Sequence, residues 1–392
     1  MSHDEPKLTS VEICAGAGGQ AVGVHDAGFR HLALIELDKN ACDTLELNVA
    51  SNDDWSDCAV LRADLKDFNI KDFAAKFNLE KQKLDLFAGG VPCPPFSAAG
   101  KQLGEDDERD LFPKALEWVE ELEPKAVMIE NVRGLLEPPQ KFRDYRSSIE
   151  RRLIKAGYEI CGWQILEACD YGVPQLRPRA ILVAMRKEYW GYFVWPEPHG
   201  SNLVTVGDAL AESMRRRFGS SARGRKAYKK WLEEASRGIA PTLVGGSKKH
   251  GGADLGPSRA KEAWRKLGVD GLGVANEPEK MVDEERDLFG PRGPKLTVSQ
   301  AAIIQGFPPD WCFSGRKTAA YRQVGNAFPP PVAKAVAEQI KYALIAGMAN
   351  PYDGDAMPQQ RCHPADGLFD ERLISLPKPT HSSRDLERAC VG

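Results

Sequence analysis

The strongest constraint on the fold is an alternation of short apolar runs with helix-like stretches over roughly the first half of the chain. The runs occupy residues 11–14, 32–35, 84–87, 126–129 and 180–184, and stretches with helical spacing lie between them, such as 110–122 and 141–156. Strands that alternate with helices form a parallel sheet covered by helices on both faces. The pattern therefore predicts a doubly wound, Rossmann-like α/β domain, in which ligands bind at the carboxyl ends of the strands.

The alternation breaks down beyond the last run and gives way to Gly, Pro and basic residues. We expect 9–187 to form the sheet domain, completed by 320–346, which includes an amphipathic helix over 332–346. A smaller, irregular domain is expected over 188–319. The polar, Pro-rich stretch 347–392 is expected to be a poorly ordered tail.

The charge of the chain is distributed unevenly. Its 53 Lys and Arg against 56 Asp and Glu give a formal charge of −3, which by itself indicates no polyanionic partner. Residues 213–268, however, contain 15 basic and four acidic side chains, so this segment carries +11 and the rest of the chain −14. Such a basic surface suits a phosphate backbone, although a solvated helix face would have a similar composition.

Membrane and metal-binding classes are disfavoured. No apolar run approaches the roughly 18 residues of a membrane span, and the first residues lack the pattern of a signal peptide, so we expect a cytoplasmic protein without membrane association. The nine cysteines include no CxxC pair and no His partner at zinc-finger spacing. We therefore expect no metal.

A glycine-rich turn follows the first apolar run and indicates a bound nucleoside. Glycines permit a tight turn and let a ligand approach the backbone. Glu36 ends the second run, 17 residues after Gly19, where doubly wound folds place an acid for ribose hydroxyls. The Lys-Ser/Thr pair of a triphosphate-binding loop does not follow the glycines, which favours a nucleoside over a triphosphate as the ligand. A purely structural strand-to-helix turn is the alternative interpretation. The candidates are Cys14, Ala15, Gly16, Gly18, Gly19 and Glu36, with Asp64 as a further polar candidate.

A nucleophile and an acid are predicted to share the crevice at the ends of the next two runs. Cys93 lies in the Pro-rich loop after 84–87, where prolines on both sides restrict the backbone. Glu130 follows 126–129, and Arg177 and Arg179 open the last run. Each residue alone also has an ordinary structural interpretation: a buried thiol, a helix cap or a solvated guanidinium.

Together these segments resemble the C5-cytosine-specific DNA methyltransferases of the bacterial type, over about residues 9 to 346. The basic segment lies where that family keeps its variable target-recognition domain. Two positions depart from the family pattern, since Cys14 stands where Phe usually contacts the adenine of the cofactor and Pro94 where Gln is common. The six ordered motifs are Glu12-Ile13-Cys14-Ala15-Gly16-Ala17-Gly18-Gly19, Pro92-Cys93, Glu130-Asn131-Val132, Gln175-Leu176-Arg177-Pro178-Arg179, 296–308 and Gln323-Val324-Gly325-Asn326-Ala327.

The resemblance implies methyl transfer from S-adenosylmethionine to C5 of a cytosine flipped out of duplex DNA. It implies that the Cys93 thiolate adds to C6, Glu130 acts at N3, Arg179 binds O2 and Arg177 supports the site. The base that removes the C5 proton is not assigned. Residues 101–109, hinged at Gly100 and Gly104, are hypothesised to close over the flipped base. For the cofactor, the resemblance implies contacts from the glycine turn, Glu36 and Asp64, and also from Gly90, Pro92 and Asn326. For DNA, it implies contacts from Ser97, Gln175, Thr242, Lys248, Lys249 and His250.

We expect a monomer that associates with the nucleoid through DNA, and the sequence leaves open whether a restriction endonuclease accompanies it. One alternative is an RNA cytosine methyltransferase on the same fold, which the long basic segment disfavours. The other is a non-catalytic DNA-binding relative, which should lack Cys93 or Glu130.

Overall fold

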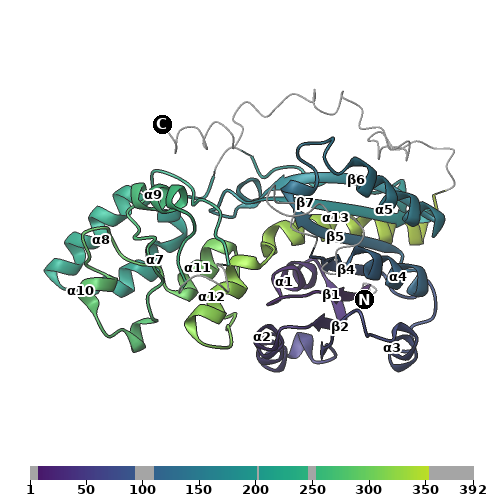
Figure 1. The fold of residues 1–392 in the computed structure, drawn as a ribbon, viewed down its shortest axis with the longest axis horizontal. Helices are drawn as coiled ribbons and strands as arrows, with labels where there is room; N and C mark the ends of the chain where they lie inside the picture. Colours follow the sequence, from purple (N-terminus) through teal and green to yellow (C-terminus); the bar gives the residue numbers. More distant parts are fainter. Residues whose placement is uncertain (1–7, 93–109, 201–202, 246–252, 353–392) are drawn as a thin grey trace, which may run out of the picture. The chain divides into compact units, whose positions relative to one another are not determined.

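The computed structural model describes residues 8–92, 110–200, 203–245 and 253–352, and it divides into two compact units (Figure 1). Among the described residues, the sheet unit comprises 8–92, 110–166, 178–197 and 332–352. Within the same described part of the chain, the helical unit comprises 167–177, 198–200, 203–245 and 253–331. Residues 167–177 and 320–331, which we expected in the sheet domain, therefore lie in the helical unit, and residues 188–197, which we expected in the smaller domain, lie in the sheet unit.

A seven-stranded sheet of order β3-β2-β1-β4-β5-β7-β6 forms the centre of the sheet unit. The pairs β2–β3, β1–β2, β1–β4 and β4–β5 are parallel, which confirms the doubly wound prediction, while β5 and β7 are antiparallel. A fully parallel sheet was therefore the wrong expectation, because an apolar run carries no information on strand direction. The strands are β1 (Leu8–Ile13), β2 (Phe29–Glu36), β3 (Ala59–Arg62), β4 (Leu86–Gly90), β5 (Ala126–Val132), β6 (Tyr158–Glu167) and β7 (Pro178–Arg186).

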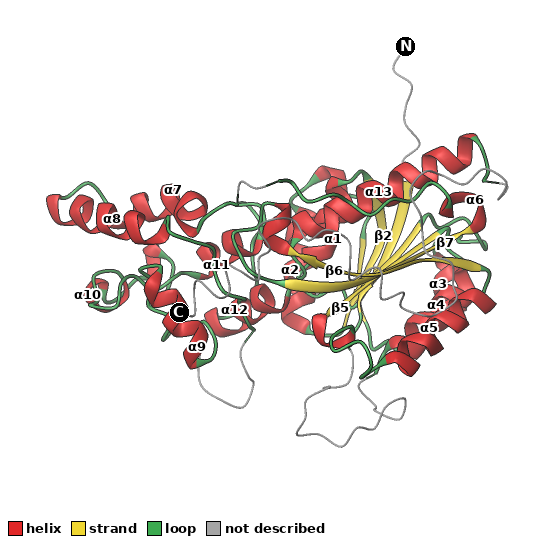
Figure 2. Cartoon of the chain, turned by 90° about the horizontal axis from the view of Figure 1, so that it is seen from above, coloured by secondary structure: helices red, strands yellow, loops and turns green. Residues whose placement is uncertain are grey.

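Helices cover both faces of this sheet (Figure 2). One face packs against α3 (Ile70–Lys76), α4 (Phe112–Leu122) and α5 (Arg143–Lys155), and their side chains share a core with alternate residues of the strands. On the other face lie α1 (Gly19–Asp26) and α13 (Pro330–Ala349), of which the part from Val332 belongs to this unit. The remaining elements of the unit are α2 (Lys39–Ala50), α6 (Lys187–Trp190), η1 (Asp53–Trp55) and η3 (Arg133–Leu135).

The helical unit has its own apolar core, centred on large side chains such as Trp231, Trp264 and Tyr321. Between the predicted strands and the final helix we had expected irregular structure, and the described part of this stretch contains a series of helices separated by irregular segments. Charged side chains on the outer faces of the helices obscure their apolar stripes in the sequence. The elements are η4 (Ala168–Tyr171), α7 (Val206–Phe218), α8 (Ala222–Ala235), α9 (Ser258–Lys266), η5 (Pro278–Lys280), α10 (Glu284–Asp287), α11 (Val298–Gln305) and α12 (Lys317–Asn326).

Candidate functional site

The carboxyl ends of β1, β4 and β5 bring three of the predicted site residues together. Gly90 of β4 pairs with Glu130 of β5 in the sheet register. A Cβ added at Gly90 would lie 3.3 Å from Glu130 Oε2 and 3.7 Å from the Cys14 carbonyl oxygen. Because Gly90 has no side chain, the Glu130 carboxylate can lie close to its backbone. This contact lies at the end of β4, from which the chain continues toward Cys93.

Glu130 forms an ion pair with Arg179 at this edge. Arg179 Nε lies 2.8 Å from Glu130 Oε1, and the two side chains are 11% and 13% exposed. The pair depends on the antiparallel β7, because the first residues of that strand lie beside the last residues of β5, with Val132 opposite Arg179. A mostly buried pair of this kind fixes the orientation of both side chains.

The other predicted arginine, Arg177, belongs to the helical unit and is 1% exposed. Its Nη1 donates to the Leu243 carbonyl at 2.6 Å, and Nη2 donates to the Gly325 and Ala327 carbonyls at 2.8 and 2.9 Å. The guanidinium is thus engaged by backbone carbonyls of two segments far apart in sequence. It positions these segments and does not present a free fork to a substrate.

Gln175, predicted to contact DNA, is fully buried in the same network. Its Nε2 donates to Gln305 Oε1 at 2.8 Å, and its Oε1 accepts a hydrogen bond from the Leu243 amide at 2.7 Å. Thr242 is half-buried, and its hydroxyl donates to the Leu176 carbonyl at 2.5 Å. In this structure, Gln175 therefore holds residues 242–243 in place and is not an exposed DNA contact.

Asn326 is exposed at the end of α12 in the helical unit, next to Gly245. A Cβ at Gly245 would lie 2.1 Å from Asn326 Oδ1, and one at Gly325 would lie 2.5 Å from the Gly245 amide nitrogen. Two glycine backbones meet here at a distance that excludes any side chain. This contact lies directly before residues 246–252, which include the predicted contacts Lys248, Lys249 and His250.

The predicted nucleoside turn adopts left-handed backbone conformations at Cys14 (φ 50°), Gly16 (φ 54°) and Gly18 (φ 89°), the last of which is the N-cap of α1. The half-buried Glu36 carboxylate organises it. Glu36 Oε2 accepts from the Gly16 amide at 2.8 Å, while Oε1 accepts from the Leu37 and Asp38 amides at 2.8 Å each. Ala15 and Gly19 are buried within the turn, and Asp64 is half-buried in the turn after β3, whereas Pro92 is exposed.

A second acid lies beside this turn and was not among the predicted site residues. Glu12 on β1 is 1% exposed, and neither carboxylate oxygen has a hydrogen-bond partner among the described residues. Burial, with smaller contributions from the Glu36 and Glu130 charges, raises the pKa of Glu12 well above its usual value. In the sequence, this site could have been found from the position of Glu12, an acidic residue within the otherwise apolar run 11–14. Burial likewise raises the pKa of the Cys14 thiol, so Cys14 is protonated at neutral pH and is not a nucleophile.

Several predicted residues lie outside the described part of the chain: Cys93, Ser97, Lys248, Lys249, His250 and the 101–109 loop with Gly100 and Gly104. Over the described residues, no group of three or more His, Cys, Asp and Glu side chains is arranged to hold a metal ion. The helices of the same part include none that is both long and apolar enough to span a membrane.

Several known proteins are similar to this chain. Residues 8–342 match the family model described as C-5 cytosine-specific DNA methylase. The chain is 47% identical to type II methyltransferase M.NaeI of Lentzea aerocolonigenes over 386 residues, covering 97% of this chain and 84% of that protein. It is 46% identical to type II methyltransferase M.NgoMIV of Neisseria gonorrhoeae over 341 residues, covering 86% and 98%.

Solved structures show the same fold at lower identity. A putative DNA modification methyltransferase encoded within an E. coli prophage aligns with a TM-score of 0.57 at 21% identity, covering 86% of this chain and 99% of that one. The S. pombe Dnmt2 methyltransferase aligns with a TM-score of 0.54 at 17% identity, covering 86% and 99%.

Proposed function

The chain belongs to the C-5 cytosine-specific DNA methylases, and from this premise we propose which of its residues carry out the reaction and contact the DNA. The protein is a DNA (cytosine-5-)-methyltransferase, and S-adenosylmethionine is its methyl donor. The observation that carries the proposed site is the Glu130–Arg179 pair, 2.8 Å apart at the sheet edge. Cytosine N3 and O2 are both bonded to C2 and lie on the same edge of the ring, so a carboxyl group and a guanidinium held side by side match them.

The glycine turn fits S-adenosylmethionine. A Cβ built at Gly16 meets nothing within 4 Å, so the backbone borders open space there. The unpartnered Glu12 carboxyl and the Glu36 carboxylate match the hydroxyl and ammonium groups of such a molecule. When bound, S-adenosylmethionine supplies an electrophilic methyl group. We assign the contact with its ribose to Glu36. Asp64, Gly90 and Pro92 are assigned the remaining contacts at this edge, and Asn326 a further contact. The turn itself is formed by Cys14, Ala15, Gly16, Gly18 and Gly19.

The proposed nucleophile is Cys93, three residues after β4 in the sequence. C5 of cytosine is a weak nucleophile, and it becomes enamine-like when a thiolate forms a bond to C6. Glu130 hydrogen-bonds to N3 and stabilises the charge that accumulates on the ring, while Arg179 binds O2. After C5 is methylated, loss of the C5 proton to a base breaks the C6–S bond and releases the Cys93 thiolate.

We assign target recognition to the helical unit together with the 246–252 segment. Residues 242–245 lead into that segment and are held by Gln175 and Arg177. Thr242, Lys248, Lys249 and His250 are proposed to contact the duplex, as is Ser97 beside the nucleophile. Flipping the cytosine costs a few kcal/mol of unpairing, which these contacts must offset.

The biological context is proposed from the relatives. Two of them are named type II methyltransferases, so we infer that this chain modifies sites that a companion restriction endonuclease would otherwise cut. The protein is proposed to work as a monomer in the bacterial cytoplasm, on nucleoid DNA. RNA methylation, the alternative on the same fold, is tested by comparing methyl incorporation into duplex DNA and into tRNA.

The test of the proposed site is bisulfite sequencing of DNA from cells that express the parent chain, Cys93→Ala or Glu130→Gln. The parent is expected to protect one cytosine within one recognised sequence. Cys93→Ala should leave all cytosines convertible, and Glu130→Gln should leave most of them so. A Cys93→Ala protein that methylates as fast as the parent would show that the proposed nucleophile is wrong.

A further inference from the structure

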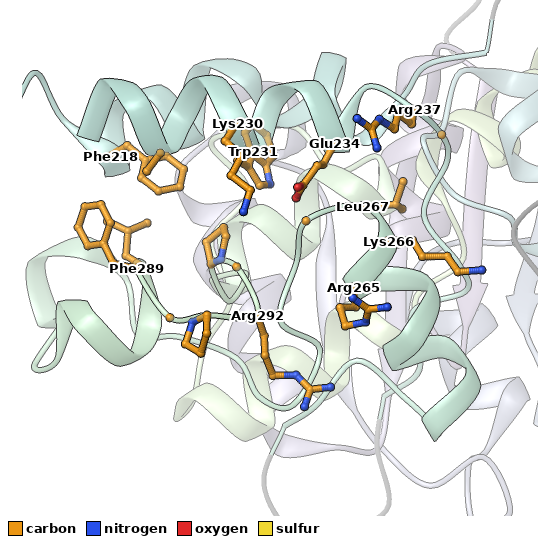
Figure 3. Close-up of a pocket in the computed structure, with 18 residues that line it drawn as sticks. Phe218, Lys230, Trp231, Glu234, Arg237, Arg265, Lys266, Leu267, Phe289 and Arg292 are labelled. Carbon is orange, nitrogen blue, oxygen red and sulfur yellow. The ribbon is translucent and has the colours of Figure 1, made fainter. Parts of the chain in front are cut away.

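The helical unit contains a cavity of about 1050 Å³ between the second half of α8, the end of α9 and residues 288–294 (Figure 3). Close glycine contacts build its wall. A Cβ at Gly293 would lie 2.2 Å from the Gly268 carbonyl oxygen, and one at Gly268 would lie 2.7 Å from Glu234 Oε2. Both glycines have positive φ, so side chains are disfavoured here for backbone reasons as well.

The side chains around this cavity are strongly basic. Five basic residues line it, against one acid, Glu234; the basic residues are Lys230, Arg237, Arg265, Lys266 and Arg292 (Figure 3). Each of the three arginines pairs with an acid: Arg237 with Glu233 at 3.2 Å, Arg265 with Glu262 at 2.6 Å and Arg292 with Asp270 at 3.8 Å. All three arginines are about half exposed or more. Exposed pairs of this kind are weak, so an entering anion can replace the carboxylates.

A buried donor also lines the cavity. Trp231 is 2% exposed, and its indole Nε1–H has no acceptor among the described residues. An unsatisfied buried N–H is costly, and an oxygen acceptor in the cavity would remove that cost. The combination of basic side chains with a neutral donor is chemistry suited to phosphate oxygens.

We propose that this cavity holds a phosphodiester of the DNA backbone, so that α8, α9 and 288–294 grip the duplex. The inference rests on the proposed role of the helical unit and names a surface that the sequence motifs do not include. The C-terminal ends of α8 and α9 line the cavity, and their carbonyl dipoles disfavour a doubly charged free phosphate. A singly charged diester balances the basic side chains with less repulsion.

The test compares two double variants that remove the same charge. Lys230→Gln/Lys266→Gln changes exposed cavity residues, and Lys226→Gln/Lys229→Gln changes exposed residues of α8 that do not line the cavity. Affinity is measured for a duplex that carries the sequence found by bisulfite sequencing, at several salt concentrations. Because one phosphate contact is lost, the cavity variant should make the plot of log affinity against log salt less steep by roughly one, and should weaken binding roughly fivefold near 0.15 M salt. The control variant should leave both nearly unchanged.

Two further measurements complete the test. Trp231→Phe keeps most of the ring and removes the donor, so it should weaken DNA binding severalfold without changing the salt slope. Inorganic phosphate is titrated against the parent and the cavity variant. Equal losses in the two double variants, or phosphate binding that Lys230→Gln/Lys266→Gln abolishes while DNA binding persists, would overturn the proposal.

The same preparations separate this inference from the proposed function. S-adenosylmethionine binding and methylation at saturating DNA should be unaltered in the cavity variant, and thermal unfolding should match the parent. A parent chain that methylates no DNA would contradict the function, whereas unchanged salt slopes on an active enzyme would contradict the cavity alone.

Discussion

Arg177 donates a 2.8 Å hydrogen bond from Nη2 to the Gly325 carbonyl, 148 residues further along the chain. Its Nη1 binds the Leu243 carbonyl, so one side chain joins the motif around Gly325 to the segment that enters 246–252. Gln175 supports the same segment through the Leu243 amide. Within the helical unit, the positions of Leu243 and Gly325 therefore depend on hydrogen bonds from two buried side chains, Arg177 and Gln175.

Arg177→Ala should destabilise the helical unit strongly. Three carbonyls lose a charged donor, and hydrogen bonds to charged groups contribute about 1.5 to 3 kcal/mol each, so we expect a loss of at least about 3 kcal/mol. Arg177→Lys should lose less, because one ammonium reaches some of these carbonyls but not all. Urea unfolding measures both. Unfolding of Arg177→Ala at the parent's midpoint would contradict the positioning role.

Glu130→Gln should reduce methyl transfer about 10²- to 10⁴-fold while S-adenosylmethionine binding stays within a few fold. The amide keeps the size of the side chain but removes the acid group and the charge opposite Arg179. Tritiated methyl transfer and calorimetric binding check the two halves of the expectation. Glu137→Gln is the matched control, since it also breaks a pair with an arginine, Arg133, and should leave activity unchanged.

The stability of the protein should depend on pH through Glu12. Its pKa is raised in the folded state, chiefly by burial, so above about pH 4.5 the unfolded chain releases a proton that the folded chain retains. This contribution is favourable at low pH and is lost as pH rises toward the folded pKa. Glu12→Gln should therefore gain stability relative to the parent between about pH 5 and pH 8, by up to about 1.4 kcal/mol per pH unit.

Urea titrations of Glu12→Gln and the parent at both pH values measure that gain. Glu46→Gln, at an exposed position of α2, is the control for the substitution itself. An equal gap between Glu12→Gln and the parent at the two pH values would mean that Glu12 titrates normally.

Gly245→Ala should disturb the contact with α12. The new Cβ would lie 2.1 Å from Asn326 Oδ1 and 2.9 Å from the Arg322 carbonyl oxygen. Overpacking of this kind typically costs about 1 to 3 kcal/mol, and movement of Asn326 should also weaken S-adenosylmethionine binding. Denaturation and calorimetry measure the two effects. Gly134→Ala is the comparison, because its Cβ would meet nothing within 4 Å.

Five of the seven strands are predicted from the sequence because apolar runs and the glycine turn are local signals, whereas β3 and β6 are not among the predicted runs. Residues 32–35 lie within β2 and residues 126–129 within β5; Glu36 is the last residue of β2, as expected, and Glu130 lies two residues before the end of β5. Strand direction is not a local property, so β7 was expected to be parallel. The burial of Gln175 was equally inaccessible, because only the folded chain shows which backbone carbonyls and amides need a side-chain partner.

The sheet unit contains both the first and the last described helix of the chain. Buried residues of α13, including Val336 and Ile340, complete a unit whose strands precede them by more than a hundred residues. On the ribosome, the whole stretch from Pro198 to Pro331 is therefore synthesised before the sheet can bury its second face. A chain released before α13 would carry the helical unit beside an unfinished sheet, and under the proposed function such a fragment would bind DNA without methylating it.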